Sequence, residues 1–193
     1  GNTSTCSSIV TVNDIEAPVI TCPADITVNN DLGICGAIVS YSTPIGTDNC
    51  SGVATTMTSG LADGAEFPAG ITTITYKVED VSGNFAECGF TVTVIDNEKP
   101  IIVCPANQIE TAEANCEFIL GDYRGLLMAT DNCTVTPNLV VIQFPAAGTL
   151  VTGTTAVSIT VSDEVNNTSV CVFDVILEDT ASPIITDCPA NQS

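Results

Sequence analysis

The sequence contains no histidine and no tryptophan, and only 3 of its 193 residues are basic: Lys77, Lys99 and Arg124. Three cations cannot neutralise a length of phosphate backbone, so no nucleic-acid partner is expected. The lack of histidine removes the commonest general base and the commonest metal-ligating side chain. No apolar run is long enough to cross a bilayer, and anionic lipid would repel the chain, so no membrane insertion is expected.

What the sequence does contain is acid, apolar residues and cysteine. Its 23 Asp and Glu residues give a net charge of −20, yet 45% of the residues are hydrophobic. This combination differs from that of an acidic disordered tail, which has few apolar residues. The ten cysteines include no closely spaced pair and have no histidine beside them, so tetrahedral zinc is disfavoured. We therefore expect the cysteines to form disulfides in an oxidising compartment, and we expect an extracellular or cell-surface location.

An internal repeat organises the chain. Pro18-Val-Ile-Thr-Cys-Pro-Ala-Asp25 returns as Pro100-Ile-Ile-Val-Cys-Pro-Ala-Asn107, and Thr47-Asp-Asn-Cys50 returns as Thr130-Asp-Asn-Cys133. A period of about 80 residues has the size of a small autonomous domain. We therefore predict the last strand of a preceding repeat over residues 1–13, domains over 14–95 and 96–178, and the first strand of a following repeat over 179–193. Four cysteines recur at offsets of 82, 81, 83 and 83: Cys22, Cys35, Cys50 and Cys88 correspond to Cys104, Cys116, Cys133 and Cys171.

Within each repeat the apolar residues alternate with polar ones. Ile74, Tyr76 and Val78 occupy every second position, as do the apolar residues that follow Cys88 and Cys171. A period of two is typical of half-buried strands, and Asp-Gly and Ser-Gly-Asn turn signals separate the runs. The pattern predicts an all-β fold, a β-sandwich of about seven strands in each repeat.

The same residues resemble the hyalin repeat, or HYR, family. The resemblance rests on Cys22-Pro-Ala-Asp25, Thr47-Asp-Asn-Cys50, Phe67-Pro-Ala-Gly70 and the run from Tyr76 to Val94. The second repeat departs from the pattern by a two-residue insertion within 122–129 and by Val-Thr-Gly at 151–153. The resemblance implies Ig-like sandwiches that occur in tandem in extracellular and cell-surface proteins, many of them adhesive.

An Ig-like arrangement with these strand parities predicts the disulfides. Cys22 and Cys88 both lie on the core side of their strands, and the first and last strands of such a sandwich can run side by side in parallel. We therefore expect Cys22–Cys88 and Cys104–Cys171, which leaves Cys35–Cys50 and Cys116–Cys133 by elimination. Cys6 and Cys188 would then pair outside these residues, either along a longer chain or between chains that exchange edge strands.

Acidic residues recur in the linkers and in two loops of each repeat. In an Ig-like topology these segments meet at the end of the domain where the chain arrives, and hard oxygen ligands suit Ca²⁺. The alternative is that Asp and Asn at these positions are ordinary solvated turn residues. The candidate Ca²⁺ ligands are Asp14, Glu16, Asp48, Asp80, Asp96, Glu98, Asp131 and Asp163.

Other candidate sites are weaker. Asn-x-Ser/Thr sequons nominate Asn2, Asn166 and Asn167 for glycosylation, and Asp179-Thr-Ala resembles a short O-glycosylation motif at Thr180. No catalytic constellation is evident, because Ser and Thr lack an activating base and the acids lie in short turns. The sequence therefore predicts a protein that is not an enzyme.

Two functions remain. The first is an extracellular structural array, a stalk or filament whose partners are neighbouring repeats or further copies of the same protein end to end. The second is an adhesion module, with Ca²⁺ as its candidate cofactor, that binds a glycan or a protein through an exposed aromatic or Arg anchor found in one repeat. Tyr123-Arg124 in the inserted loop is the candidate anchor.

Overall fold

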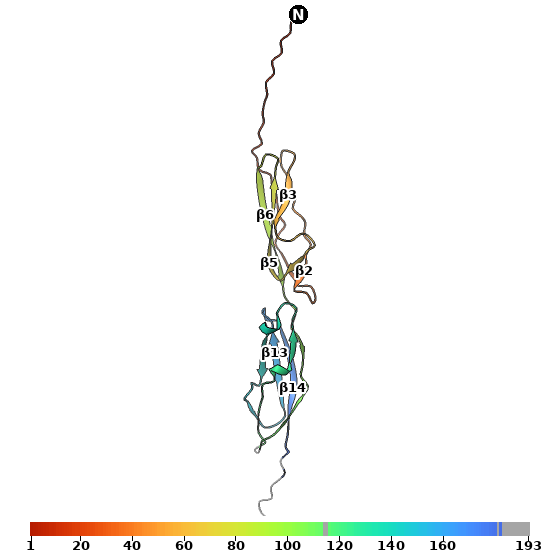
Figure 1. Ribbon diagram of the computed structural model, residues 1–193, viewed down its shortest axis with the longest axis vertical. Helices are drawn as coiled ribbons and strands as arrows, with labels where there is room; N and C mark the ends of the chain where they lie inside the picture. Colours follow the sequence, from red (N-terminus) through yellow and green to blue (C-terminus); the bar gives the residue numbers. More distant parts are fainter. Residues whose placement is uncertain (114–115, 181, 183–193) are drawn as a thin grey trace, which may run out of the picture. The chain divides into compact units, whose positions relative to one another are not determined.

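The computed structural model describes residues 1–113, 116–180 and 182 (Figure 1). The chain forms two compact units that divide between Asp96 and Asn97. Helix in the described residues is confined to two 3₁₀ turns, η1 (Arg124–Leu126) and η2 (Thr136–Asn138). No helix within the described residues is long and apolar enough to traverse a bilayer. The remaining described residues form strands and loops, which confirms the all-β fold.

The first unit is a sandwich of one four-stranded sheet and a smaller facing layer. The large sheet has the order β1-β6-β5-β3, and the facing layer holds the β2–β4 pair and an isolated bridge between Val19 and Thr47. The six strands are β1 (Ile26–Asn29), β2 (Gly36–Ile38), β3 (Ala54–Ser59), β4 (Glu66–Pro68), β5 (Gly70–Glu79) and β6 (Phe85–Ile95).

The second unit repeats this plan. Its large sheet has the order β11-β13-β14-β8, and its facing layer holds the pairs β10–β7 and β12–β9. The β10–β7 pair occupies the place of the Val19–Thr47 bridge of the first unit. The eight strands are β7 (Ile101–Val103), β8 (Gln108–Thr111), β9 (Phe118–Ile119), β10 (Met128–Thr130), β11 (Val140–Phe144), β12 (Leu150–Val151), β13 (Thr155–Ser162) and β14 (Thr168–Glu178).

The predicted alternation governs burial. Along β5 the odd-even pattern places Ile74, Tyr76 and Val78 in the interior, and their partners on β6 include Phe90 opposite Ile74. In the second unit Val157, Ile159 and Val161 of β13 are fully buried in the same way. Each unit therefore has its own hydrophobic core, built from the inward faces of its two layers.

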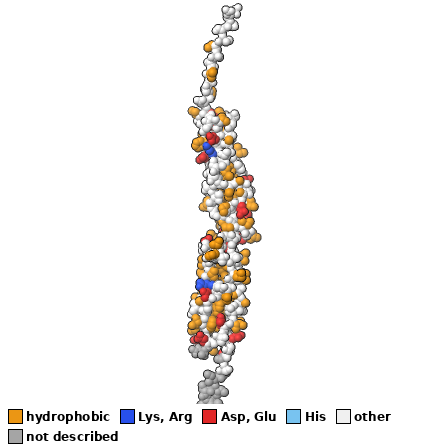
Figure 2. Space-filling view, in the orientation of Figure 1, with side chains coloured by type: hydrophobic (Ala, Val, Ile, Leu, Met, Phe, Trp, Pro, Cys, Tyr) orange, Lys and Arg blue, Asp and Glu red, His pale blue; other side chains and the backbone are white. Residues whose placement is uncertain are grey.

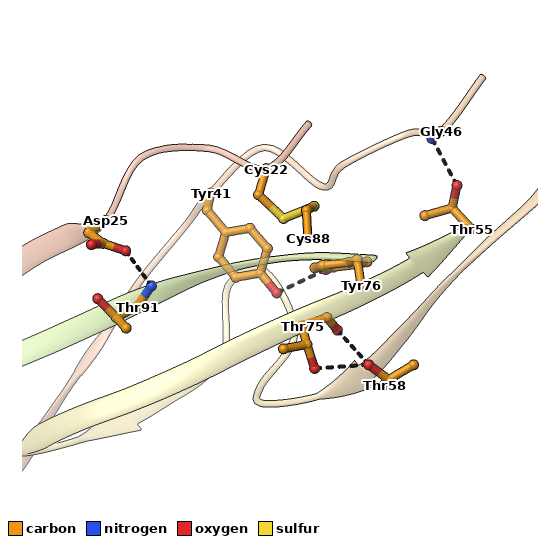
Figure 3. Close-up of a disulfide and its surroundings, with 10 residues drawn as sticks. All are labelled: Cys22, Asp25, Tyr41, Gly46, Thr55, Thr58, Thr75, Tyr76, Cys88 and Thr91. Carbon is orange, nitrogen blue, oxygen red and sulfur yellow. Dashed lines mark hydrogen bonds between the residues drawn. A yellow bond between two sulfur atoms is a disulfide. The ribbon is translucent and has the colours of Figure 1, made fainter. Parts of the chain in front are cut away.

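The first strand of each large sheet runs parallel to the last. Val28 of β1 lies opposite Val94 of β6, and Ile109 of β8 lies opposite Ile176 of β14. This arrangement brings Cys22 next to Cys88, and the structure contains that disulfide with a Cα–Cα distance of 5.7 Å (Figure 3). The Cys104–Cys171 disulfide spans 5.6 Å in the second unit. Both disulfides expected from strand parity are present.

The pairing of the other cysteines was wrong. Cys50 and Cys116 are exposed free thiols, so neither Cys35–Cys50 nor Cys116–Cys133 exists, although Cys35 and Cys133 are disulfide-bonded. The reason is distance along the sheet. The carbonyl of Cys35 accepts a hydrogen bond from Ala69, just before β5, whereas the Cys50 thiol senses the charge of Asp80, just after β5. The ten residues of β5 separate these points by about 30 Å, and a disulfide needs Cα atoms within about 7 Å.

The N-terminal residues lie outside the strands of the first unit. Residues 1–12 form no strand, and Ile9, Val10 and Val12 are almost fully exposed. Figure 2 shows hydrophobic side chains at the surface along this N-terminal segment. Asp179 and Thr180 are exposed after β14. The predicted first strand of a following repeat, with Cys188, lies otherwise outside the described residues. The assignment of both termini to flanking repeats stays a prediction.

A buried tyrosine pair ties the two layers of the first unit together. The Tyr41 hydroxyl donates to the Leu61 carbonyl at 2.6 Å and lies 3.1 Å from the Tyr76 hydroxyl, while its ring meets Phe90 edge-on at 5.0 Å (Figure 3). Burial first, and then the hydrogen bond to Tyr76 and the charge of Asp63, raise the pKa of the Tyr41 phenol above its ordinary range. The neutral phenol is therefore the form that the fold requires.

We predict that the first unit loses stability at alkaline pH through Tyr41. In the unfolded chain this phenol ionises near pH 10, but in the folded unit it stays protonated. Its stabilising contribution is thus complete below pH 10 and declines above it, by roughly 1 kcal/mol or less at pH 10.5. Urea unfolding at pH 8 and pH 10.5 measures the loss. Tyr41→Phe should cost about 1–2 kcal/mol at pH 8 and show a smaller alkaline decline, and an equal decline in both proteins would contradict the assignment.

Candidate functional site

Three segments converge at the end of the first unit where the chain arrives. They are the linker around Asp14, the loop at 48–50 and the β5–β6 turn at 80–84. The Asn49 amide donates to the Glu16 carboxylate at 2.5 Å, and the Asn84 amide donates to the Asp14 carbonyl at 3.3 Å. Two side-chain hydrogen bonds thus tie the linker to both loops. We call this region the N-terminal end of the repeat.

The carboxylates of Asp14 and Asp48 gather here with the thiol of Cys50. One ligand atom of each lies within 4.8 Å of the others. The Asp48 Oδ1 accepts from the Cys50 amide at 2.7 Å, and the Asp14 Oδ1 accepts from the Glu16 amide at 3.1 Å. The Asp14 Oδ2 is buried and has no hydrogen-bond partner. A buried carboxylate oxygen without a partner is costly unless a cation or a water completes it.

The second repeat has the corresponding cluster of three carboxylates, Asp96, Asp131 and Asp163, again within 4.8 Å of one another. The Asp131 Oδ1 accepts from the amides of Cys133 and Thr134 at 2.9 and 2.7 Å. The Asp131 Oδ2 is buried without a partner, as the Asp14 Oδ2 is. An orphaned carboxylate oxygen therefore recurs in both clusters.

Asp80 and its counterpart Asp163 have a structural role that the sequence did not reveal. Each accepts two backbone amides of its hairpin turn, those of Ser82 and Asn84 in the case of Asp80, and also the side-chain amide of an asparagine. Burial alone would raise the pKa of Asp80, but the hydrogen bonds from residues 82–84 outweigh it and lower the pKa. Asp80 lies outside the first cluster, so it shapes the turn rather than joining Asp14 and Asp48. The remaining candidates, Glu16 and Glu98, lie in the linkers outside both clusters.

The two clusters differ in their third member, which is the Cys50 thiol in the first and the Asp163 carboxylate in the second. In the first, a hydrogen bond with Asp14, then burial, and then the charges of Asp14, Asp48 and Asp80 raise the pKa of the Cys50 thiol. A neutral thiol is a poor ligand for a hard cation, whereas three carboxylates are suitable ligands. The residues of the second cluster therefore fit Ca²⁺ better than those of the first, which offers two carboxylates.

The glycosylation candidates differ in accessibility. Asn2, Asn166 and Thr180 are exposed. The Asn167 amide nitrogen, to which a glycan would be attached, donates to Asp163 at 2.7 Å inside the hairpin turn. The amide of Asn167 is thus engaged within the turn, whereas Asn166 is exposed, and glycosylation of either residue stays a prediction.

One recurring side chain was missed. Asp25 accepts a hydrogen bond from the Thr91 amide of β6 at 2.6 Å (Figure 3), and Asn107 accepts one from the Asp174 amide of β14 at 3.0 Å. These residues end the Cys-Pro-Ala-Asp and Cys-Pro-Ala-Asn motifs, and they satisfy a strand amide where parallel pairing has not yet begun. The signal was available, because only Asp and Asn, both short acceptors, occupy this position in the two repeats.

In the second unit the outward face of the large sheet has four exposed apolar side chains, with Ser158 and Thr160 of β13 between them. Ile142 and Phe144 of β11 and Val170 and Val172 of β14 all point to solvent, and Phe144 is 73% exposed. The corresponding face of the first unit carries the Thr58–Thr75 hydrogen bond and the Lys77–Glu79 ion pair instead. An open hollow of about 330 Å³ adjoins the face, beside Arg124 and Ile142. We call the four apolar residues the β11–β14 face.

The expected anchor Tyr123-Arg124 is only half exposed. Tyr123 is buried against Phe173, at a ring distance of 5.6 Å, and belongs to the core. Arg124 is exposed and donates two hydrogen bonds from its guanidinium and one from its backbone amide to Asp122, and these bonds lower the pKa of that carboxyl to about 2. Phe144, rather than Tyr123, is the exposed aromatic residue that distinguishes the second repeat.

Comparison with known proteins places this architecture in a family. Residues 13–94 match the HYR domain. Hyalin of Lytechinus variegatus is 31% identical over 197 residues, which cover 96% of this chain and 36% of that protein. Hyalin of Strongylocentrotus purpuratus is 36% identical over 118 residues, which cover 58% of this chain and 10% of that protein. The chain thus spans only about a tenth to a third of the relatives that it matches.

Among solved structures, Drosophila N-cadherin EC1-4 aligns with 84% of this chain and 50% of its own, at 12% identity and a TM-score of 0.41. The likeness to hyalin runs through both repeats, and the family model covers the first of them. The chain belongs to the HYR domain family.

Proposed function

We propose that the chain is a non-enzymatic module of an extracellular adhesion protein, in which tandem HYR repeats form a stalk or filament. The observation that carries this is the path of the chain through each repeat. It arrives beside Asn84, at the start of β6, and it leaves at Ile95, whose carbonyl accepts the Asn30 amide at the far end of β6. The 11 residues of β6 separate these ends by about 35 Å. Repeats with opposite ends can be joined in series without the chain turning back.

The acidic composition fits such a protein. An array that exposes strand edges and apolar side chains is protected from sideways association by a net charge of −20. The partners of the module would be neighbouring repeats and further copies of the protein.

The array is tested by small-angle scattering of the 193-residue chain. Repeats joined in series should give a distance distribution typical of a rod, with a maximum dimension above about 70 Å from two β6-length domains. A distribution typical of a sphere would contradict the array. Scattering at several protein concentrations separates a rod-like monomer from an aggregate.

Calcium would bind at the N-terminal end of each repeat. The supporting observation is the orphaned, buried carboxylate oxygen in each cluster, on Asp14 and on Asp131. A bound Ca²⁺ would satisfy these oxygens, offset the repulsion between neighbouring acids and hold the linker against the loops. Asp96, Asp131 and Asp163 would hold the better occupied site, because all three are carboxylates.

We predict that calcium raises the melting temperature. At a hundredfold excess over its Kd, a ligand that binds only the folded state contributes about 2.7 kcal/mol, or about 10 °C or more for a domain of this size. Calorimetry in Ca²⁺ and then in a chelator measures the shift. Asp131→Asn keeps the Oδ1 that accepts the loop amides, yet it should abolish most of the gain in the second repeat. Glu87→Gln, which removes an exposed charge from β6, is the control and should keep the gain.

Equal melting temperatures with and without Ca²⁺ would remove calcium from the proposal and leave the array in place. A gain that Mg²⁺ reproduces at the same concentration would indicate charge screening rather than a site. The scattering experiment and the calcium experiment therefore test the two parts of the proposal independently.

Ligand binding through the β11–β14 face is the second candidate function, and the exposure of Phe144 favours it. Exposed apolar residues on one repeat, beside a hollow lined by Arg124, are typical of a surface that recognises a glycan or a protein. On a glycan array, Phe144→Ser should abolish binding by the chain without lowering its melting temperature. Thr56→Ser, on the same face of the first repeat, is the matched control. Binding that survives Phe144→Ser would exclude this face.

A further inference from the structure

Each repeat has one cysteine near each of its ends, besides the disulfide that joins its first and last strands. Cys50 lies at the N-terminal end of the first repeat, where its thiol is among the carboxylates of Asp14 and Asp48. Cys116 lies at the other end of the second repeat. There its amide donates to the Glu113 carbonyl at 2.9 Å, and the preceding residue, Ala112, donates its amide to the carbonyl of Glu178, the last residue of β14. Both are exposed free thiols.

The equivalent cysteines of the other repeat are disulfide-bonded. Cys133 corresponds to Cys50, and Cys35 corresponds to Cys116; both are oxidised. The two loops therefore accommodate a disulfide. Within one repeat these two positions lie about 30 Å apart along the sheet, so a partner for Cys50 or Cys116 has to come from outside its own repeat. The two free thiols, whose counterparts in the other repeat are oxidised, are therefore available to a partner outside their own repeat.

We propose that Cys116 of one chain and Cys50 of a second copy form a disulfide that joins the copies head to tail. The inference rests on the proposed array, to which it adds a covalent joint. The joint differs from strand exchange, because it uses two ordered loops and no segment of either terminus. In a longer natural chain, the same chemistry would link the outer thiols to the next repeat on each side.

The bond requires an oxidant, and a small disulfide such as oxidised glutathione supplies it. The thiolate of one cysteine attacks the glutathione disulfide, forms a mixed disulfide and releases one glutathione thiolate. The second cysteine, as its thiolate, attacks the protein sulfur of the mixed disulfide and releases the second glutathione. One glutathione disulfide is thereby reduced to two thiols, which take up the two protons that the cysteine thiols lose, and one Cys50–Cys116 bond forms.

Charge should control the rate of this reaction. Asp14 and Asp48 surround the Cys50 thiol, and Glu113 and Glu117 flank Cys116 in sequence and hydrogen-bond to each other through their backbones. Two acidic loops repel each other at low ionic strength. Cross-linking should therefore proceed several-fold faster in 0.5 M NaCl than in 0.02 M NaCl.

The test uses the 193-residue chain with Cys6→Ser and Cys188→Ser, which removes the two remaining cysteines that could cross-link. This parent is incubated in a glutathione redox buffer and run on a non-reducing gel. We expect a ladder of oligomers that collapses with reductant. In this background Cys50→Ser alone and Cys116→Ser alone should stay monomeric, and an equimolar mixture of the two should form dimers and nothing larger.

The bonded cysteines are identified by mass spectrometry of a mixture of ¹⁵N-labelled and unlabelled chains. Cleavage at Asp and Glu is needed, because three basic residues give trypsin too few sites. A cross-linked peptide with Cys50 from one isotope and Cys116 from the other confirms the proposal. Dimers of Cys50→Ser with itself, or a dominant Cys50–Cys50 or Cys116–Cys116 peptide, would overturn it.

Persistence of the monomer in the parent would also overturn it, provided that Cys22–Cys88 and Cys104–Cys171 are found intact in the same digest. That result leaves the array untouched, because scattering of the chain tests the array and needs no cross-link. A compact chain that nevertheless forms Cys50–Cys116 bonds would contradict the array and keep the joint.

Discussion

Loss of the Cys22–Cys88 disulfide should lower the free energy of unfolding of the first repeat by about 4 kcal/mol. The bond closes a loop across 66 residues, nearly the whole domain. In the chain-entropy account, a loop of this length costs the unfolded state about 4 kcal/mol of conformational freedom. A domain of about 80 residues has a stability of the same order. We therefore expect Cys22→Ala with Cys88→Ala to leave the first repeat largely unfolded at 37 °C.

The second repeat provides the internal control for this experiment. Each unit has its own core, so calorimetry should resolve a transition for each. The Cys22/Cys88 variant should shift the transition of the first repeat and leave that of the second in place, and Cys104→Ala with Cys171→Ala should do the reverse. Because Cys171 is fully buried, its loss also leaves a cavity, and the second shift should be at least as large. A shift below about 1 kcal/mol would show that the unfolded state is already compact.

Strand parity predicted these two disulfides because it depends on a local property. Side chains alternate strictly along a strand, so a cysteine in phase with Phe90 and Val92 has to face the core. Parallel pairing of the first and last strands follows from the sandwich topology. Both pieces of information are present in a short stretch of sequence around Cys22 and Cys88.

The other cysteines could not be paired in this way, because they lie in loops. Cys35 follows the turn at 31–34, and Cys50 follows Asp48 and Asn49, so neither has a strand phase. Pairing by elimination assumed that every repeat is closed on itself. In the structure the two loops lie at opposite ends of a ten-residue strand, and the assumption fails on distance.

The acids illustrate the same division. The recurrence of Asp48 and Asp131 predicted that linker and loop acids would meet, and the clusters contain five of the eight candidates. Asp80 was indistinguishable from them in the sequence, but its carboxylate is occupied by the amides of its own turn. Asp163 accepts the corresponding turn amides and still belongs to the second cluster. Whether a turn acid also meets the linker acid therefore depends on packing that periodicity does not encode.

The two Phe-Pro-Ala motifs show that an identical motif can occupy different environments in the two repeats. Phe67-Pro-Ala and Phe144-Pro-Ala are identical in sequence, yet Phe67 is 0% exposed and Phe144 is 73% exposed. Alignment of the repeats explains the difference, since Phe67 on β4 corresponds in the sheet to Val151 on β12. Its cross-strand partner Ala37 corresponds to Phe118, the partner of Val151. The large and small members of this buried pair are exchanged between the repeats, and Phe144 lies outside the pair.

This exchange predicts a rescue. Phe67→Val should destabilise the first repeat by about 2–4 kcal/mol, because it leaves a cavity in the core. Ala37→Phe should cost about 1–3 kcal/mol, because it overpacks the same space. The double variant restores the pair that the second repeat uses, and its volume exceeds that of the native pair only by the two carbon atoms that distinguish Val from Ala. It should therefore be more stable than Phe67→Val alone, with a favourable coupling energy of about 1–3 kcal/mol.

Urea unfolding of the four proteins in the cycle measures the coupling. Phe144→Val is the matched control, since it removes the same atoms from an exposed ring and should change the free energy of unfolding by less than about 0.5 kcal/mol. Additive effects of Phe67→Val and Ala37→Phe would mean that β2 and β4 do not share one packing volume. Coupling of the expected size would show that the two repeats fill the same space in the core with a phenylalanine from opposite strands of the pair, Phe67 of β4 in the first repeat and Phe118 of β9 in the second. Comparison of the motifs alone could not reveal this exchange.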